Sequence, residues 1–173
     1  MSGTHISAAM RQAVGRQYGA MTSYPISASD IRRWAAAVYW PETPPRLYWD
    51  EEYAKGTRHG GIVAPEEYNP FAWMTPDTEG APRQASPHHD TDDIERRIGV
   101  KGPGLRHMLN GGADVDYGER MRPGDVVRSI TQLTGYRERL GRLGLMLITV
   151  YTTTWTNQRD EVVKTQAGTL IRY

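Results

Sequence analysis

The sequence contains no cysteine and no long apolar run. The absence of cysteine excludes disulfide bonds, thiolate metal sites and thiol nucleophiles. No apolar run approaches the ~20 residues of a membrane span, and residues 1–19 lack the apolar region of a secretory signal. The 21 basic and 20 acidic residues give a net charge of +1, so nothing in the charge points to a nucleic acid or membrane partner. We therefore expect a cytoplasmic protein.

The length and the N-terminal third predict one domain that begins with a helix. A chain of 173 residues with 38% hydrophobic residues fits a single core. Residues 1–24 are small, polar and weakly periodic, which predicts an N-terminal arm before a domain over residues 25–173. Ser27 and Asp30 have the spacing of a helix cap. The residues that follow share one helical face: Ile31, Trp34, Ala35 and Val38.

The middle of the chain predicts a second helix and a long loop. Pro65 suits the first turn of a helix, so a helix with an aromatic face is expected over residues 65–74, with Pro70 as an unfavourable residue inside it. Glu66 and Glu67 would then lie where the helix dipole favours acids. The following segment is rich in proline, glycine and aspartate, which predicts a long loop or lid insertion over residues 75–106.

The last third of the sequence is typical of β structure. Residues 111–120 are compatible with an edge strand. Longer strands are predicted over residues 126–139, 144–157 and 161–173, separated by short turns, and together they form an antiparallel meander. Helices followed by a run of antiparallel strands predict an α+β domain in which a helix packs on a curved sheet.

Four segments occur in an order that resembles a known family. They are DIRRWAAAVYW running into PETPPRLYWDEEYA, then HGGIVAPEEYNPFAW, ERMRPGDVV and LGRLGLMLITVYTTTWTNQRDEVVKTQAGTLIRY. Over roughly residues 20–173 the chain resembles the MaoC-like dehydratases, in particular their N-terminal-domain type. The resemblance implies a hot-dog fold, a curved antiparallel sheet wrapped around a central helix, and dimers joined sheet edge to sheet edge. It also implies addition or removal of water on an acyl thioester of coenzyme A or acyl-carrier protein, with no separate cofactor.

The family's catalytic motifs are altered in this chain. Hydration of an enoyl thioester needs a general base, a general acid and an N–H donor to the thioester oxygen. The resemblance implies that the acid/base pair comes from G-D-x-N-P-x-H and the donor from V-H-G. Tyr48 stands at the histidine position, and Trp40, Pro41 or Glu42 at the aspartate position. A tyrosine with a pKa near 10 is a poor base, and Pro65, where active members have glycine, has no N–H.

These changes predict an acyl-thioester-binding subunit of an enoyl-CoA hydratase or 3-hydroxyacyl dehydratase that lacks its own acid/base pair. In heteromeric members of the family, one subunit keeps the pair and a homologous subunit without it enlarges the tunnel for a bulky acyl chain, as in fatty acid, steroid or polyketide metabolism. Two alternatives stay open. One is a self-sufficient hydratase that uses replacement residues, and the other is a non-enzymatic, acyl-binding hot-dog homodimer.

Several residues are candidates for the site. Replacement catalytic groups would come from Tyr48, Glu42, Asp50 and His59, although Asp50 also suits the cap of a turn at residues 51–55 and Glu42 suits plain solvent exposure. The candidate substrate-binding residues are Tyr48, His59, Gly60, Gly61, Pro65 and Asn69.

Three further groups have structural explanations. The hairpin arginines suit a coenzyme A phosphate and suit solvent equally well: Arg137, Arg139 and Arg142. Five aromatic side chains are expected in the core: Trp34, Trp40, Trp49, Phe71 and Trp73. No metal is predicted, because neighbouring histidines in a loop lack a rigid ligand geometry and no second cluster completes a site: His88, His89 and Asp90.

Overall fold

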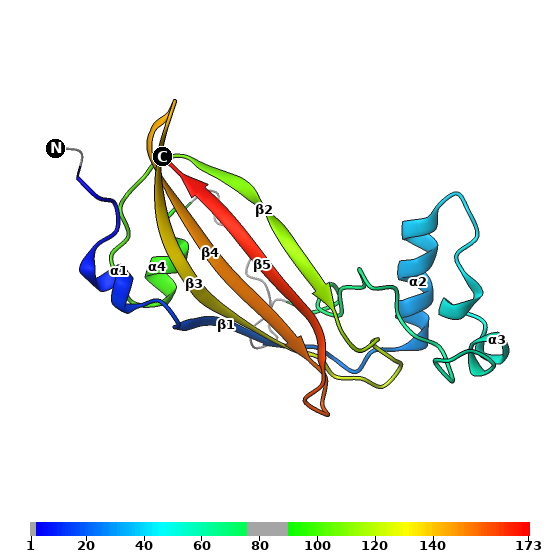
Figure 1. The fold of residues 1–173 in the computed structure, drawn as a ribbon. Helices are drawn as coiled ribbons and strands as arrows, with labels where there is room; N and C mark the ends of the chain where they lie inside the picture. Colours follow the sequence, from blue (N-terminus) through cyan, green and yellow to red (C-terminus); the bar gives the residue numbers. More distant parts are fainter. Residues whose placement is uncertain (1–2, 76–89) are drawn as a thin grey trace.

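The computed structural model describes residues 3–75 and 90–173 (Figure 1). Its centre is a five-stranded antiparallel sheet with the strand order β1-β3-β4-β5-β2. The strands are β1 (Gln17–Thr22), β2 (Met108–Tyr117), β3 (Arg128–Gly141), β4 (Gly144–Thr156) and β5 (Val162–Arg172). The helices of the described residues are α1 (Ala8–Gln12), α2 (Ala28–Tyr39), the 3-10 helix η1 (Arg46–Tyr48), α3 (Glu51–Lys55) and α4 (Asp93–Arg97).

The sheet confirms the predicted α+β fold and its antiparallel meander. β3, β4 and β5 are neighbours in the sheet, and β2 lies at the edge, as the sequence predicts. The segment expected as an N-terminal arm contributes α1 and β1, and β1 forms the opposite edge by pairing with β3. Gly144, with φ of 94°, and Asp160, with φ of 60°, provide the positive φ angles of the two tight hairpin turns.

One face of the sheet, the inner face, carries the buried side chains. Alternation along paired strands places Leu133, Tyr151 and Leu147 on this face. Leu133 packs with Ile94 of α4, and Leu147 packs with Met10 of α1, so α1 and α4 cover the same end of the sheet (Figure 1). At the other end, a separate cluster joins α2 to the segment of residues 62–74.

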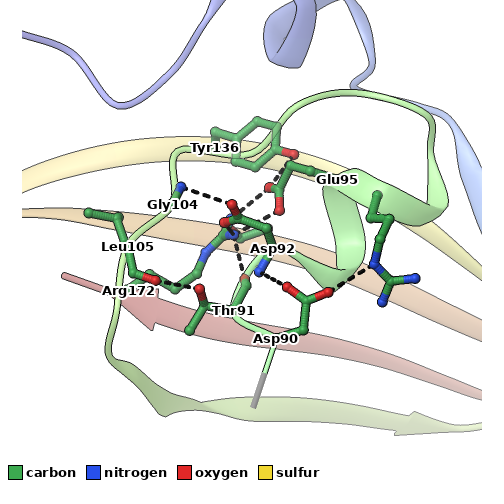
Figure 2. A network of polar contacts seen from close by, with 10 residues as sticks. Asp90, Thr91, Asp92, Glu95, Gly104, Leu105, Tyr136 and Arg172 are labelled. Atoms are coloured by element: carbon green, nitrogen blue, oxygen red, sulfur yellow. Dashed lines mark hydrogen bonds and ion pairs between the residues drawn. The ribbon is translucent and has the colours of Figure 1, made fainter. Parts of the chain in front are cut away.

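A buried ion pair fixes α4 to the sheet (Figure 2). Arg172 of β5 donates two hydrogen bonds of 2.7 Å to Glu95 of α4, and the two residues are 1% and 0% exposed. Arg172 also donates to Thr149 at 2.8 Å, while the Tyr136 hydroxyl donates to Glu95 at 2.7 Å. Burial alone would raise the pKa of Glu95, but the bonds and charge of Arg172 and the hydroxyl of Tyr136 outweigh it and lower that pKa.

The helix cap predicted at Ser27 is confirmed at the start of α2. The Ser27 hydroxyl accepts from the Asp30 N–H at 3.0 Å and donates to the Asp30 carboxylate at 2.7 Å. Ile31 and Ala35 are fully buried on the expected face, and Trp34 packs edge-on against Tyr68 with ring centroids 5.5 Å apart. Val38, the last residue of the predicted apolar face, is instead 56% exposed.

The predicted helix over residues 65–74 was wrong. This segment forms a series of turns, because Pro70 has no N–H for a helical bond and the Asn69 side chain accepts from the Phe71 N–H at 3.0 Å instead. The helices that pack on the inner face are α1 and α4, and α4 lies within the segment predicted as a loop. The rest of that segment includes residues 76–89, which lie outside the described residues together with the histidines considered as metal ligands.

The core prediction for the aromatic residues was partly wrong. Phe71 is 5% exposed and packs edge-on against Trp155. Trp40, Trp49 and Trp73 are instead 81%, 39% and 47% exposed.

In the described part of the chain, every helix is too short or too polar to cross a bilayer. Residues 3–75 and 90–173 likewise contain no group of three or more His, Asp or Glu side chains arranged to hold a metal ion.

Candidate functional site

Two extended segments lie side by side and form the frame of the site. The Ala64 N–H donates to the Met121 carbonyl at 2.8 Å, which joins the segment after β2 to the segment that begins at His59. Met121 is 4% exposed and belongs to the core cluster of α2. Successive side chains of an extended chain point to opposite sides, so Arg120 and Arg122 both lie on the side away from the core.

The two arginines bind to the segment that they flank. Arg120 donates to the Ala64 carbonyl from Nε at 3.2 Å and from Nη2 at 2.8 Å, and its Nη1 donates to the Glu66 carboxylate at 2.7 Å. Arg122 donates from Nη1 to the His59 carbonyl at 2.6 Å. The structure therefore assigns Glu66 to an ion pair. Its neighbour Glu67 accepts from the Tyr117 hydroxyl, so the helix-dipole explanation for the two acids was wrong.

Tyr48 lies beside a second tyrosine at the end of α2. Tyr48 is in η1, and the ring centroids of Tyr39 and Tyr48 are 6.1 Å apart. A hydrogen bond with Tyr48 and, to a smaller degree, burial raise the pKa of Tyr39, while Arg120 lowers it and Glu66 raises it. The tyrosine pair therefore lies within electrostatic range of the Arg120–Glu66 ion pair, and Tyr39 is protonated at neutral pH.

His59 is half-buried where the first of the two segments begins, and its carbonyl accepts from Arg122 of the other segment. Its Nε2 is 3.3 Å from Nε of Arg58. Burial lowers the pKa of His59, and the positive charges of Arg58, Arg120 and Arg122 lower it further. A histidine whose pKa lies below its ordinary 6.5 is neutral at pH 7. His59 is therefore a neutral imidazole surrounded by three guanidinium groups.

In the segment after His59, the space beside the two glycines is unoccupied by described atoms, whereas Pro65 is buried. Gly60 has a φ of 66°, and a Cβ added at Gly60 or Gly61 would meet no described atom within 4 Å. Pro65 is buried and lines a small hollow with room for about 10 Å³. The hollow is formed by Ala64, Pro65, Glu66, Tyr117, Gly118, Glu119, Arg120, Met121 and Val163. Because proline has no N–H, Pro65 offers this hollow no backbone donor.

Three of the candidate residues have structural roles outside this group. Asp50 caps α3 by accepting from the Tyr53 N–H at 3.0 Å, as predicted, and its other oxygen pairs with Arg46 at 2.6 Å. The Tyr53 N–H, followed by Arg46, lowers the pKa of Asp50, so this carboxylate stays charged. Glu42 is exposed after the end of α2, and Asn69 holds the turn before Phe71.

The structure thus brings together some predicted residues and some that the sequence did not indicate. Tyr48, His59 and Pro65 lie around one frame, as do their neighbours Gly60 and Gly61. The residues missed from the sequence are Tyr39, Arg58, Arg120 and Arg122. The alternation of arginine around Met121 in ERMRPGDVV is the signal that could have indicated the last two, because it places both on one side of an extended segment.

Comparison with known proteins places the chain in a family. Residues 12–166 match the model of the FAS1-like dehydratase domain region. The structure is similar to the MaoC-like dehydratase from Rhodospirillum rubrum, with a TM-score of 0.60 and 20% identity over 93% of this chain and 92% of that chain. The chain therefore belongs to the FAS1-like dehydratase domain region family, and it has the hot-dog fold of the MaoC-like dehydratase that it resembles.

Two similar structures are complexes from Mycobacterium tuberculosis. The ChsH1–ChsH2 complex matches with a TM-score of 0.64 and 17% identity over 96% of this chain and 88% of that chain. A C-terminally truncated HadBC complex, a 3R-hydroxyacyl-ACP dehydratase, matches with a TM-score of 0.52 and 18% identity over 91% of this chain and 99% of that chain. No curated protein matches the chain.

Proposed function

We propose that this chain is an acyl-thioester-binding subunit of a hydratase or dehydratase and that a homologous subunit supplies the acid/base pair. One observation carries the proposal. The residue at the position of the family's histidine, Tyr48, is paired with another tyrosine, and the residue at the position of its N–H donor is the buried Pro65. These groups provide neither a base near pH 7 nor a backbone donor to a developing oxyanion.

The need for a partner is supported by the size of the hollow beside Pro65. The hollow has room for about 10 Å³, roughly one water molecule, which is far below the ~300–1,000 Å³ typical of small-molecule pockets. The described residues of one chain therefore do not enclose an acyl chain of any length. A second subunit over this region would supply the remaining wall. That two similar structures are complexes of two named subunits supports the same arrangement for this chain.

Exposed apolar side chains near the site support a subunit interface. Trp40 and Trp49 flank the segment that carries Tyr48, and both are exposed. Leu109 and Val115 of β2 are 47% and 37% exposed, and β2 is an edge strand of the sheet formed by the described residues. Edge strands and exposed aromatic residues are regular sites of association. We propose a homologous MaoC-like subunit as the partner, with an acyl-CoA or acyl-carrier-protein thioester as the shared substrate.

One observation favours a second candidate, a self-sufficient hydratase that uses His59. This imidazole is neutral at pH 7 and lies in the same frame as Tyr48. A neutral imidazole is a competent general base. In this candidate mechanism, His59 would activate water and Arg120, which lies within electrostatic range of both His59 and Tyr39, would stabilise the negative charge that develops on the thioester oxygen.

The two candidates are separated by turnover of a crotonyl or longer enoyl thioester. We expect the purified chain alone to show no hydration, and hydration to appear when a homologous subunit that carries G-D-x-N-P-x-H is added. Turnover by the chain alone above ~1 per second, a rate typical of enzymes, would overturn the proposal. If His59→Gln then abolished that turnover while Glu42→Gln did not, the second candidate would replace it. A stable homodimer that binds the thioester, without turnover and without such a partner, would instead favour a non-enzymatic binding protein.

A further inference from the structure

Three arginines contact the segment from His59 to Ala64. We call Arg58, Arg120 and Arg122 the arginine cluster. Arg122 is held by the His59 carbonyl at 2.6 Å, Arg120 by the Ala64 carbonyl at 2.8 Å, and Arg58 by the His59 ring at 3.3 Å. The cluster is thus anchored by neutral oxygen and nitrogen atoms of a single short segment, although its members are up to 64 residues apart in the sequence.

The positive charge of the cluster is only partly neutralised. Glu66 pairs with Arg120 at 2.7 Å. Arg58 and Arg122 form no ion pair with any carboxylate of the described residues. The nearest acid in sequence, Asp125, accepts from the backbone N–H of Arg122 at 2.8 Å and pairs with Arg159 at 2.9 Å, so its charge is directed elsewhere. Two guanidinium groups therefore remain available to an anion.

A backbone donor adds to the cluster. The N–H of Gly61 donates to no acceptor among the described residues, and no described atom lies within 4 Å of where a Cβ would stand at Gly60 or Gly61. A ligand can therefore approach this backbone closely. Guanidinium groups match phosphate oxygens with two parallel hydrogen bonds. The Gly60 N–H donates to the Thr57 carbonyl at 3.0 Å, which leaves the Gly61 N–H as the backbone donor for an anion here.

We propose that the arginine cluster, together with the N–H of Gly61, binds a phosphate group of the thioester carrier. The inference rests on the proposed function for the identity of the ligand, since both coenzyme A and the phosphopantetheine arm of a carrier protein contain such a phosphate. The cluster borders the hollow at Pro65 through Arg120, so a phosphate held here directs the attached arm along the frame that carries Tyr48 and His59.

The hairpin arginines considered from the sequence lack this arrangement. Arg137 and Arg139 are exposed residues of β3, on the face of the sheet opposite to Leu133, and Arg142 is exposed in the β3–β4 turn. No hydrogen bond or ion pair to the described residues fixes any of their guanidinium groups. They carry the same charge without a shared anchor, and this makes Arg139 a matched control.

The test is calorimetric titration of the full chain with pyrophosphate and with coenzyme A, near physiological ionic strength of about 0.15 M to screen diffuse attraction. Arg122→Gln and Arg58→Gln should each weaken binding at least about tenfold, the loss expected when a hydrogen bond to a charged group is removed. Arg139→Gln should leave it unchanged. Equal losses in all three variants, or no binding by the parent chain, would refute the site.

Two further measurements distinguish coenzyme A from a carrier protein as the source of the phosphate, and a failure of the phosphate site from a failure of the proposed function. If coenzyme A binds and a holo-carrier protein does not, the carrier is coenzyme A, and the opposite result assigns the carrier protein. Arg58 is exposed and supports no described contact besides His59, so Arg58→Gln remains a fair test if Arg122→Gln unfolds. The titration needs neither turnover nor a partner. A chain that hydrates thioesters alone but loses phosphate in the arginine variants would therefore contradict the proposed function and keep the site.

Discussion

The ion pair of Arg172 and Glu95 should be the most costly polar contact to break from one side. Arg172→Met keeps the length of the side chain but leaves Glu95, which is 0% exposed, with the Tyr136 hydroxyl as its remaining described partner. Removing one member of a buried pair costs about 3–5 kcal/mol. For a chain of this length, each kcal/mol lowers Tm by roughly 2–4 °C, so the variant should melt about 10 °C lower.

Urea unfolding at pH 7 would measure this loss, with Arg97→Met as the control. Arg97 pairs with Asp93 on the same helix, but the two side chains are 51% and 37% exposed, and an exposed pair contributes at most about 1 kcal/mol. The double variant Arg172→Met with Glu95→Leu should recover much of the stability, because no charge is then left buried. If Arg172→Met cost less than about 1 kcal/mol, water would have to reach Glu95, and the ion pair would not be buried from solvent.

Three other predictions follow from the fold. The pKa of Glu95 lies below its ordinary 4.5, so the stability that ionised Glu95 gives to the folded chain is complete above pH 4.5 and is lost as the pH falls through the lower pKa. Glu95→Gln should therefore flatten the acid limb of a stability–pH curve. A Cβ at Gly168 would lie 2.3 Å from the Tyr151 ring, so Gly168→Ala should cost about 1–3 kcal/mol in urea unfolding, whereas Gly135→Ala, with no described atom within 4 Å, should cost less than half of that. Ser27→Ala should cost about 1 kcal/mol in the same assay through the lost cap of α2, and Ser27→Asp should retain most of that stability.

The sequence determined the features that depend on local spacing. The cap at Ser27, the cap at Asp50 and the strands β3, β4 and β5 all lie where the pattern predicts them. Each of them depends on residues a few positions apart, or on an alternation along one segment, and such signals are complete in the chain itself. The assignment of Tyr48 and Pro65 to altered motif positions comes from the resemblance to the family and stays a prediction.

Only the tertiary structure decided which distant residues meet. Arg172 and Glu95 are 77 positions apart, and their pairing requires that α4 pack on the inner face of the sheet, which no local pattern predicts. Trp40 and Trp73 are exposed although they are aromatic, because burial depends on which elements cover a side chain and not on its own hydrophobicity. The arginine cluster has the same origin. Arg120 and Arg122 bind to the segment that follows Arg58, and the backbone hydrogen bond from Ala64 to Met121 joins these two segments, which are far apart in the sequence.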